Sequence, residues 1–347
     1  MARGQSSWAN RSTWARWFAG VASLMLVVLL AAPTAWAALP QGNAVTDPAA
    51  LLRNALPIKA PDLQELQHRL EATSDDLRAK RWPALASSVR RCISLLGSRK
   101  AAMLEGFDAP AKTEAATLLD FLAARREALN SIGKAEDLLV GPFPYQIPAE
   151  FADLPRLLGR ATVQLTTTKG DLTAVVDGYN APLTAGAFVD LVQRGFYDGL
   201  PFIRAEDFYV LQTGDPEGPN DGFIDPKTKT ERKVPLEIKV PGQSEPFYNQ
   251  TFEDLGMFKA APELPFSTKG TLGWAHSDEV LDDGSSQFFL FLFEPELTPA
   301  GLNLIDGRYA AFGYVVDGFD VLEELTADDG IVKARVLSGS ENLQPHS

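Results

Sequence analysis

The chain of 347 residues holds few cysteine and histidine side chains, which are frequent nucleophiles, bases and zinc ligands. Cys92 is the only cysteine, and the three histidines, His68, His276 and His346, are scattered along the sequence. One thiol cannot form a disulfide within the chain, and it lies in an apolar helical stretch, so we interpret it as a core residue. No Cys, His or carboxylate spacing is typical of zinc, and no glycine-rich phosphate loop is present. The sequence therefore predicts chemistry without a metal or nucleotide cofactor.

Three stretches of the C-terminal half carry the chemical argument. The first runs from Ala181 through Gly-Phe-Tyr-Asp-Gly-Leu200 to Arg204, and the second is Phe208-Tyr-Val-Leu-Gln-Thr-Gly-Asp215. The third is Gly284-Ser-Ser-Gln-Phe-Phe289, followed later by Leu304-Ile-Asp-Gly-Arg-Tyr-Ala-Ala-Phe-Gly313. Each stretch alone is weak, because short apolar matches arise by chance, but their order and spacing together are specific.

With Lys233-Val-Pro-Leu-Glu237, these stretches resemble the cyclophilin family of peptidyl-prolyl isomerases, from about Gly159 to Leu337. The family's Phe-x-Arg, Gln-x-Gly-Asp and Ser-Gln-Phe-Phe motifs occur here in the same order and spacing. The resemblance implies a closed antiparallel eight-stranded β-barrel capped by two helices. It also implies an enzyme that isomerises X-Pro bonds and needs no cofactor.

Such an enzyme must lower a rotational barrier of ~20 kcal/mol, which amide resonance sets. Twisting the bond localises a lone pair on the prolyl nitrogen. An arginine that donates a hydrogen bond to that nitrogen stabilises the twisted state more than the planar one. Matched position by position, the resemblance implies that Arg204 is this catalytic arginine and that Gln212 is the amide that orients it. An ordinary surface arginine is the alternative interpretation of Arg204.

The resemblance also implies a groove for the proline ring and the neighbouring backbone. The proline pocket falls on four residues and the backbone groove on two: Tyr209, Val210, Phe289 and Ile305, and then Ala275 and Gln287. The rim departs from the family pattern, because His276, Leu304 and Tyr309 replace the usual Asn, Trp and His. Isomerisation needs no proton transfer, so we interpret His276 as a groove residue and not as a base. The altered rim predicts low turnover.

The elements that would position these residues are mainly strands. Alternating or β-favouring segments predict strands at 161–167, 172–176, 208–212, 270–275, 287–293, 310–315 and 331–336. Helices are predicted at 185–194 and 319–325. Many strands without a repeated βαβ unit favour an antiparallel barrel capped by helices.

The N-terminal half shows a helical pattern instead. Apolar residues recur at helical spacing from about 46 to 140, which predicts a bundle of three or four helices. The segment 141–158 is rich in proline and predicts a linker. The predicted organisation is multidomain α and β, with a signal peptide at 1–38, a helical bundle at 39–140, this linker, and the cyclophilin-like domain at 159–347.

The first 38 residues are typical of a secretory leader. Arg3, Arg11 and Arg16 precede an apolar run over 18–32, and Ala35-Trp36-Ala37 offers a cleavage site. The run is shorter than the ~20 apolar residues of a spanning helix, so we expect cleavage and no integral membrane protein afterwards. An uncleaved anchor is the alternative. The formal charge of −13 argues against a nucleic-acid partner.

The whole layout resembles the multidomain cyclophilins of the thylakoid lumen and their cyanobacterial relatives. This resemblance implies an exported protein of the lumen or periplasm that helps to assemble or maintain photosynthetic membrane complexes, especially photosystem II. Its partners would be proline-containing polypeptide clients, including subunits of membrane complexes. A catalytically weak binding module on the same fold is the alternative function. A third hypothesis is that the helical domain or the linker covers the groove.

Overall fold

The computed structural model describes residues 47–71, 129, 133, 136, 139–206, 209–258, 260–277, 280–293 and 303–345. The chain divides into units 1–41 and 42–347, and every described residue belongs to the second unit. The predicted signal peptide, Cys92, His346 and most of the predicted helical bundle lie outside the described residues. In the described part, no helix combines the length and the apolar character that a membrane crossing requires.

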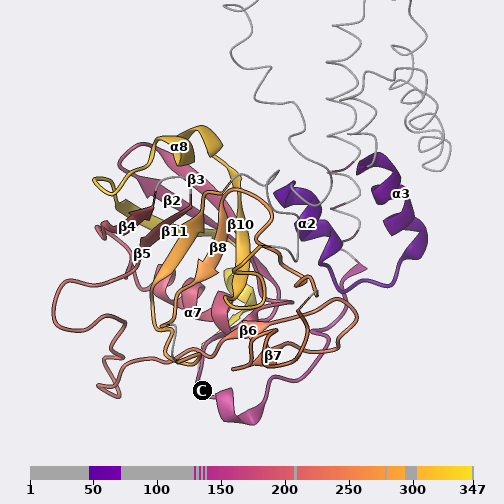
Figure 1. The fold of residues 1–347 in the computed structure, drawn as a ribbon, viewed down its shortest axis with the longest axis horizontal. Helices are drawn as coiled ribbons and strands as arrows, with labels where there is room; N and C mark the ends of the chain where they lie inside the picture. Colours follow the sequence, from indigo (N-terminus) through magenta and orange to yellow (C-terminus); the bar gives the residue numbers. More distant parts are fainter. Residues whose placement is uncertain are drawn as a thin grey trace, which may run out of the picture. The chain divides into compact units, whose positions relative to one another are not determined.

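Eight antiparallel strands form one sheet in the order β11-β2-β3-β10-β8-β9-β5-β4 (Figure 1). Their bounds are β2 Arg160–Thr167, β3 Asp171–Asp177, β4 Phe202–Glu206, β5 Val210–Thr213, β8 Thr271–Trp274, β9 Phe288–Phe291, β10 Ala311–Asp317 and β11 Ile331–Ser338. Every strand except β4 overlaps a predicted strand. The antiparallel eight-stranded arrangement expected from the sequence is therefore confirmed.

The sheet is open, so the prediction of a closed barrel is not met. The edge strands β4 and β11 approach each other through an isolated bridge between Pro201 and Gly330. The backbone N–H of Phe202 donates to the carbonyl of Asp329 at 3.0 Å beside it. Proline has no N–H to donate, which prevents a regular ladder from continuing through this bridge.

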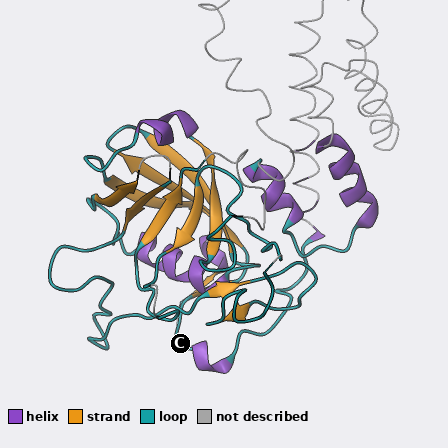
Figure 2. Ribbon diagram, viewed as in Figure 1, coloured by secondary structure: helices purple, strands orange, loops and turns teal. Residues whose placement is uncertain are grey.

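Two helices cover the ends of the sheet, as the sequence predicted. Helix α8 (Phe319–Glu324) lies above the strands and α7 (Pro182–Gln193) below them in the view of Figures 1 and 2. Helix α7 begins earlier than predicted, because Pro182 is a favoured first residue whose missing N–H costs nothing there. Its residues from Pro182 to Val192 are buried, and the Phe188 ring lies edge-on to Phe288 at 5.1 Å.

The first turn of α7 is capped from a distance. Ala181, at the N-cap, offers no side-chain acceptor. The carboxylate of Glu237 accepts instead, from the backbone N–H groups of Leu183 and Thr184 at 3.0 Å each and from the Thr184 hydroxyl at 3.1 Å. Glu237 lies on β6 (Glu237–Ile238), which pairs with β7 (Phe247–Tyr248). The carboxylate thus satisfies N–H groups that the helix itself leaves unpaired.

Short elements flank the sheet. Strand β1 (Arg156–Leu157) pairs with β12 (Leu343–Gln344), close to the 3-10 helices η4 (Ala149–Phe151) and η5 (Ser340–Asn342) in sequence. In the predicted linker, the Tyr145 hydroxyl donates to the carbonyl of Tyr179 at 3.1 Å. The Tyr145 ring also lies 5.4 Å from the Lys239 ammonium. These linker contacts are with residues outside the predicted groove.

Two N-terminal helices are described, α2 (Pro48–Asn54) and α3 (Pro61–Glu71), and both lie in the region predicted to be helical. The Asp47 carboxylate caps α2 by accepting from the Ala49 N–H at 3.0 Å. Arg53 pairs with Glu71 at 2.9 Å, which ties the two helices together through a largely buried contact.

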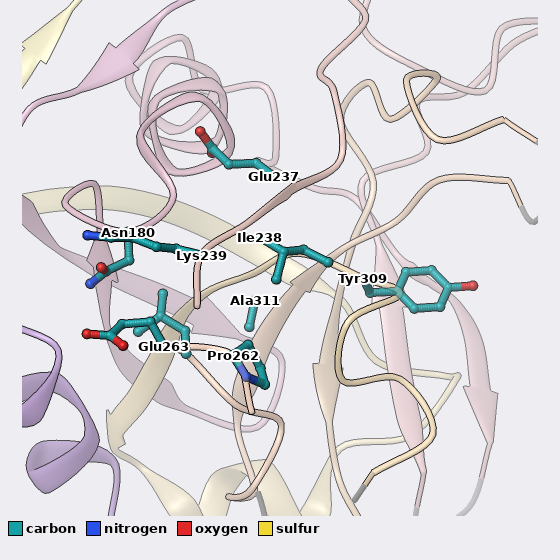
Figure 3. A pocket seen from close by; sticks show the side chains of 9 residues that line it. Asn180, Glu237, Ile238, Lys239, Pro262, Glu263, Tyr309 and Ala311 are labelled. Carbon is teal, nitrogen blue, oxygen red and sulfur yellow. The ribbon is translucent and has the colours of Figure 1, made fainter. Parts of the chain in front are cut away.

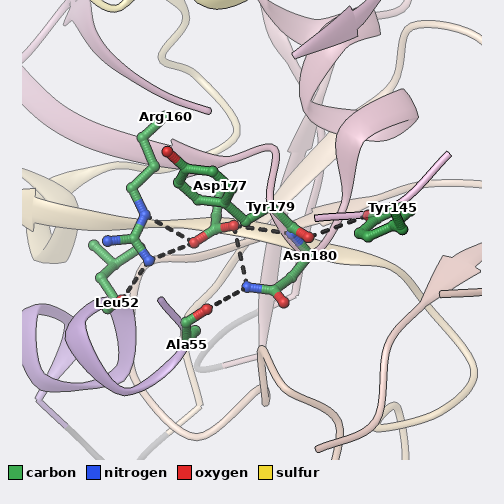
Figure 4. Close-up of polar contacts among 7 residues, drawn as sticks. All are labelled: Leu52, Ala55, Tyr145, Arg160, Asp177, Tyr179 and Asn180. Carbon is green, nitrogen blue, oxygen red and sulfur yellow. Dashed lines mark hydrogen bonds and ion pairs between the residues drawn. The ribbon is translucent and has the colours of Figure 1, made fainter. Parts of the chain in front are cut away.

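The C-terminal end of α2 is fixed by side chains of β2, of β3 and of the segment that follows β3 (Figure 4). Arg160 donates to the Leu52 carbonyl, and the Asn180 amide donates to the Ala55 carbonyl at 2.9 Å. Asp177 holds both donors, because its carboxylate accepts from the Arg160 Nε at 2.8 Å and from the Asn180 side chain at 3.2 Å. The last carbonyls of α2, which a helix leaves without partners, are thereby satisfied.

Candidate active site

Four residues of the site form a row across four strands. On the β4–β5 ladder Arg204 stands directly opposite Gln212, on β5–β9 Gln212 stands opposite Phe289, and on β8–β9 Phe289 stands opposite Gly273. Directly opposed residues of an antiparallel pair place their side chains on the same face, with Cβ atoms about 5 Å apart. The register therefore brings Arg204 and Gln212, which lie on one hairpin, together with Phe289, which is distant in sequence.

The Phe289 ring is held between close neighbours. A Cβ atom on Gly273 would lie 2.2 Å from the ring, so the glycine leaves the space that the ring occupies. Phe266 stacks on Phe289 with centroids 5.7 Å apart, and Tyr309 lies edge-on to it at 5.7 Å. Phe289 is only 5% exposed as a result.

The predicted proline-pocket residues belong to one apolar cluster. Val210, Phe289 and Ile305 are buried members of it, and Tyr209 and Tyr309 pack against it. The same cluster extends to Leu51, Leu52 and Ala55 in and just after helix α2. The structure therefore brings the predicted lining residues together, in a continuous apolar surface that also seats α2.

The guanidinium of Arg204 is bound to a neighbour on its own strand. Its Nε donates to Glu206 Oε1 at 2.8 Å, and its Nη2 donates to the same oxygen. The Gln212 amide donates to the Gln287 side-chain oxygen at 2.7 Å, and Gln287 donates to the Asp221 carbonyl at 2.7 Å. The predicted groove residues Gln212 and Gln287 are thus in direct contact, whereas the hydrogen bonds of Arg204 go to Glu206.

Tyr209 closes the hairpin between β4 and β5, where its N–H donates to the Glu206 carbonyl at 2.9 Å. Its ring lies edge-on to Phe291 at 5.9 Å. Burial raises the pKa of the Tyr209 hydroxyl, and the Glu206 carboxylate adds to this rise while the Arg204 guanidinium opposes it. The phenol therefore lies within the electrostatic reach of the ion pair and stays protonated at neutral pH.

The rim residues lie around Tyr309. The His276 ring stacks on Tyr309 at 4.6 Å, and its two nitrogens lie 2.7 Å from the Ser277 carbonyl and 2.9 Å from the Arg308 carbonyl. Both partners are carbonyl oxygens, so a neutral imidazole ring donates to only one of them. Ala275 is half-buried, and its N–H donates to the Gln287 carbonyl at 3.0 Å. Leu304 is 83% exposed at the rim.

A separate small pocket shares Tyr309 with this site (Figure 3). Glu237, Lys239 and Glu263 also line it, but Arg204, Gln212 and Phe289 do not. Burial raises the pKa of Glu237 to about 8, against the lowering effect of its hydrogen bonds from α7. Burial also lowers the pKa of Lys239 and raises that of Glu263. This pocket therefore shares Tyr309 with the predicted groove and is also lined by the ionisable side chains of Glu237, Lys239 and Glu263.

Three contributors were not predicted as site residues: Glu206, Phe266 and Gly273. The sequence could have pointed to Gly273, because a glycine inside a predicted strand often marks a place where another group approaches the backbone closely. Phe266 and Glu206 had no such signal, since their contacts depend on how the chain folds back. Within the described ranges, no group of three or more His, Cys, Asp or Glu side chains is arranged to hold a metal ion.

Two family profiles match the chain. The profile described as "Cyclophilin type peptidyl-prolyl cis-trans isomerase/CLD" matches residues 162–339. The profile described as "Peptidyl-prolyl cis-trans isomerase CYP38-like, PsbQ-like domain" matches residues 47–139.

Whole-chain relatives carry the same pair of halves. A protein of Synechocystis sp. named as a thylakoid lumen peptidyl-prolyl cis-trans isomerase is 51% identical over 331 residues, covering 90% of this chain and 87% of that protein. The chloroplastic peptidyl-prolyl cis-trans isomerase CYP38 of Arabidopsis thaliana is 42% identical over 333 residues, covering 87% of this chain and 76% of that protein.

Proposed function

Because the chain belongs to the cyclophilin-type peptidyl-prolyl cis-trans isomerase family, we propose that it binds proline-containing segments beside Arg204 and accelerates rotation about their X-Pro bonds. The observation that carries the site assignment is the row of Arg204, Gln212 and Phe289 across β4, β5 and β9. The row joins a strong hydrogen-bond donor to the apolar cluster that would hold the proline ring.

Each part of the row has a role in this proposal. Arg204 donates to the prolyl nitrogen as the bond twists, when the nitrogen regains its lone pair. Gln212 and Gln287, whose side chains are hydrogen-bonded to each other, present polar groups to the client backbone. Val210, Phe289 and Ile305 supply the apolar wall. No covalent bond forms or breaks, and no cofactor takes part.

The test is the cis/trans exchange rate of an X-Pro model peptide, measured by NMR with the mature chain and with Arg204→Ala. Loss of one transition-state donor is expected to lower the catalysed rate by about 10²–10³-fold. Unchanged acceleration in Arg204→Ala would remove Arg204 from the catalytic role.

A second candidate function is a binding module that holds proline segments with little turnover. Two observations favour it: Val210, Phe289 and Ile305 are almost fully buried, and the Arg204 donors already contact Glu206. Peptide binding without faster exchange, in the same NMR samples, would identify this function.

The remaining proposals concern context. We place the protein in the thylakoid lumen, because its Synechocystis relative carries that location in its name and its Arabidopsis relative is chloroplastic. We propose a cleaved signal peptide at 1–38, a helical domain at 39–140, a linker at 141–158 and the cyclophilin-like domain at 159–347. Subunits of photosynthetic membrane complexes are the proposed clients. Fractionation of cells, with detection of the mature chain, tests the location.

A further inference from the structure

The pairing of Arg204 with Glu206 follows from the geometry of one strand. Residues two apart on a strand project from the same face, so both side chains leave β4 on the side of the row. Glu206 stands opposite Val210 on β5, and Arg204 stands opposite Gln212. The carboxylate therefore lies beside a wall of the proline pocket as well as beside the arginine.

The pair limits what Arg204 can offer a client. A guanidinium has five N–H donors, and the Nε and Nη2 contacts to Glu206 Oε1 use two of them. The carboxylate also offsets the positive charge that strengthens a hydrogen bond to the prolyl nitrogen. Arg204 is therefore a better donor when Glu206 has another partner.

The pair is also easily exchanged. The Arg204 and Glu206 side chains are 55% and 47% exposed. Ion pairs this exposed shift an equilibrium by only about 2- to 5-fold, because water and salt screen them. A cation delivered by a bound polypeptide can thus compete for Glu206 at low cost.

The other charged groups along this side of the sheet give a client cation little opposition. Gln287 contacts the carbonyl of Asp221. The pKa of Asp215 is raised, mainly by burial and in addition by the nearby carboxylate of Asp221. Near the rim, Arg308 is paired with Glu253 at 2.5 Å. The described flanks of the row therefore favour positive charge on the client.

We infer that Glu206 is a specificity-determining residue, which selects proline segments that carry a Lys or Arg close to the proline. The client cation pairs with Glu206 and thereby releases Arg204 to donate to the twisting X-Pro bond. This inference rests on the proposed function, because it concerns the same groove. It assigns Glu206 a role in choosing the client, separate from the role of Arg204 in turnover.

The experiment uses the mature full-length chain and two pairs of short X-Pro peptides. One pair has Lys or Glu just before the proline, and the other has Lys or Glu just after it. NMR gives both the exchange rate and the dissociation constant at about 0.02 M and about 0.5 M salt. In the wild type, at least one pair is expected to favour Lys by about threefold or more at low salt.

Glu206→Gln is expected to reduce that preference to less than about 1.5-fold and to remove its salt dependence. The matched control is Glu323→Gln, which removes one negative charge from an exposed pair with Lys269 on another part of the surface. The control should keep the wild-type preference, which separates a local effect of Glu206 from the overall negative charge. Equal preference in the wild type and in Glu206→Gln, or no preference in either pair, would overturn the inference.

The outcomes also separate this inference from the proposed function. If Arg204→Ala abolishes turnover but Glu206→Gln leaves the preference unchanged, the isomerase function stands and the role of Glu206 fails. If no variant accelerates exchange but Lys peptides bind more tightly only when Glu206 is present, catalysis fails and the role of Glu206 stands. If none of the peptides binds, both fail.

Discussion

Two arginine–carboxylate pairs of this protein differ mainly in their surroundings. Asp177 is fully buried and Arg160 nearly so, and their pair is joined to Asn180 and to the end of α2. Arg204 and Glu206 lie about half-exposed on the edge strand β4. Removing one partner of a buried pair leaves the other charge unpaired and out of contact with water. The partners of an exposed pair can instead be replaced by water or by other ions. The buried pair therefore suits a structural role, and the exposed pair is free to exchange partners, as our proposal for Glu206 requires.

The largest effect on stability is expected from Asp177→Ala. Without the carboxylate, Arg160 keeps a largely buried charge. The Asn180 backbone N–H loses its acceptor, and the Asn180 side chain keeps only its hydrogen bond to the Ala55 carbonyl. The free energy of unfolding should fall by about 3–5 kcal/mol, measured by urea denaturation. Asp177→Asn, which keeps the size and one acceptor oxygen, should lose less. A loss below about 1 kcal/mol in Asp177→Ala would place this pair with the exposed one.

A third pair, Arg232 with Asp190 at 2.6 Å, tests whether burial sets the cost of breaking an ion pair, because both partners are buried. Arg232→Met should cost about 3 kcal/mol, somewhat less than Asp177→Ala, since Arg194 still donates to Asp190 at 2.8 Å. The double variant Arg232→Met/Asp190→Leu should recover part of this loss, because it removes both buried charges and leaves only Arg194, which is 33% exposed and can be hydrated. A double variant that is less stable than the single one would show that the pair itself contributes net stability.

An intermediate effect that depends on pH is expected at Glu237. Its carboxyl pKa rises from 4.5 to about 8 on folding, so the folded chain binds this proton more tightly than the unfolded chain. Its contribution to stability is therefore complete below about pH 4.5 and is lost as the pH rises towards 8.

Glu237→Gln keeps an acceptor oxygen for the N–H groups of α7 but does not titrate. Between pH 5 and 8, the stability of the wild type should fall by about 3 kcal/mol more than that of Glu237→Gln. Other groups titrate equally in both proteins, so the difference between their melting curves isolates Glu237. Parallel curves across this range would contradict the raised pKa.

The smallest effect on stability is expected from the exposed pair. Arg204→Ala and Glu206→Gln should each change the free energy of unfolding by less than about 0.5 kcal/mol, because water replaces the lost partner. Urea denaturation of the same samples used for the NMR exchange measurements checks this. A loss above about 1 kcal/mol for either variant would mean that the edge of β4 is structural, and changes in turnover would then be ambiguous.

The proposed groove residues came from the family resemblance, and strand alternation, which is a local property, predicted the strands that carry several of them. Gln212 and Phe289 lie in segments whose pattern predicts strands, and the observed register places them opposite each other. Strand β4, which carries Arg204, was missed as an element, because after the buried Phe202 its residues are all exposed and show no alternation. Its existence depends on pairing with β5, which a sequence pattern does not reveal.

Hydrogen-bond partners were less predictable than positions. The orientation of Arg204 by Gln212 came from the family resemblance, and the structure instead pairs Gln212 with Gln287 and Arg204 with Glu206. The contact between Phe266 and Phe289 and the capping of α7 by Glu237 were also not predicted, since both join distant parts of the chain. The open edge between β4 and β11 depends on Pro201 meeting Gly330, another distant contact.

The sequence by itself determined the family, the predominance of antiparallel strands and the residues that we propose for the groove, because the first and third follow from motif order and the second from a period of two residues. Only the tertiary structure decided which arginine is buried with its carboxylate and which remains in water. Burial is a property of the folded surroundings, and the energy of a charge depends on those surroundings more than on the residue type. Arg160 and Arg204 are the same side chain, and the fold gives them different surroundings.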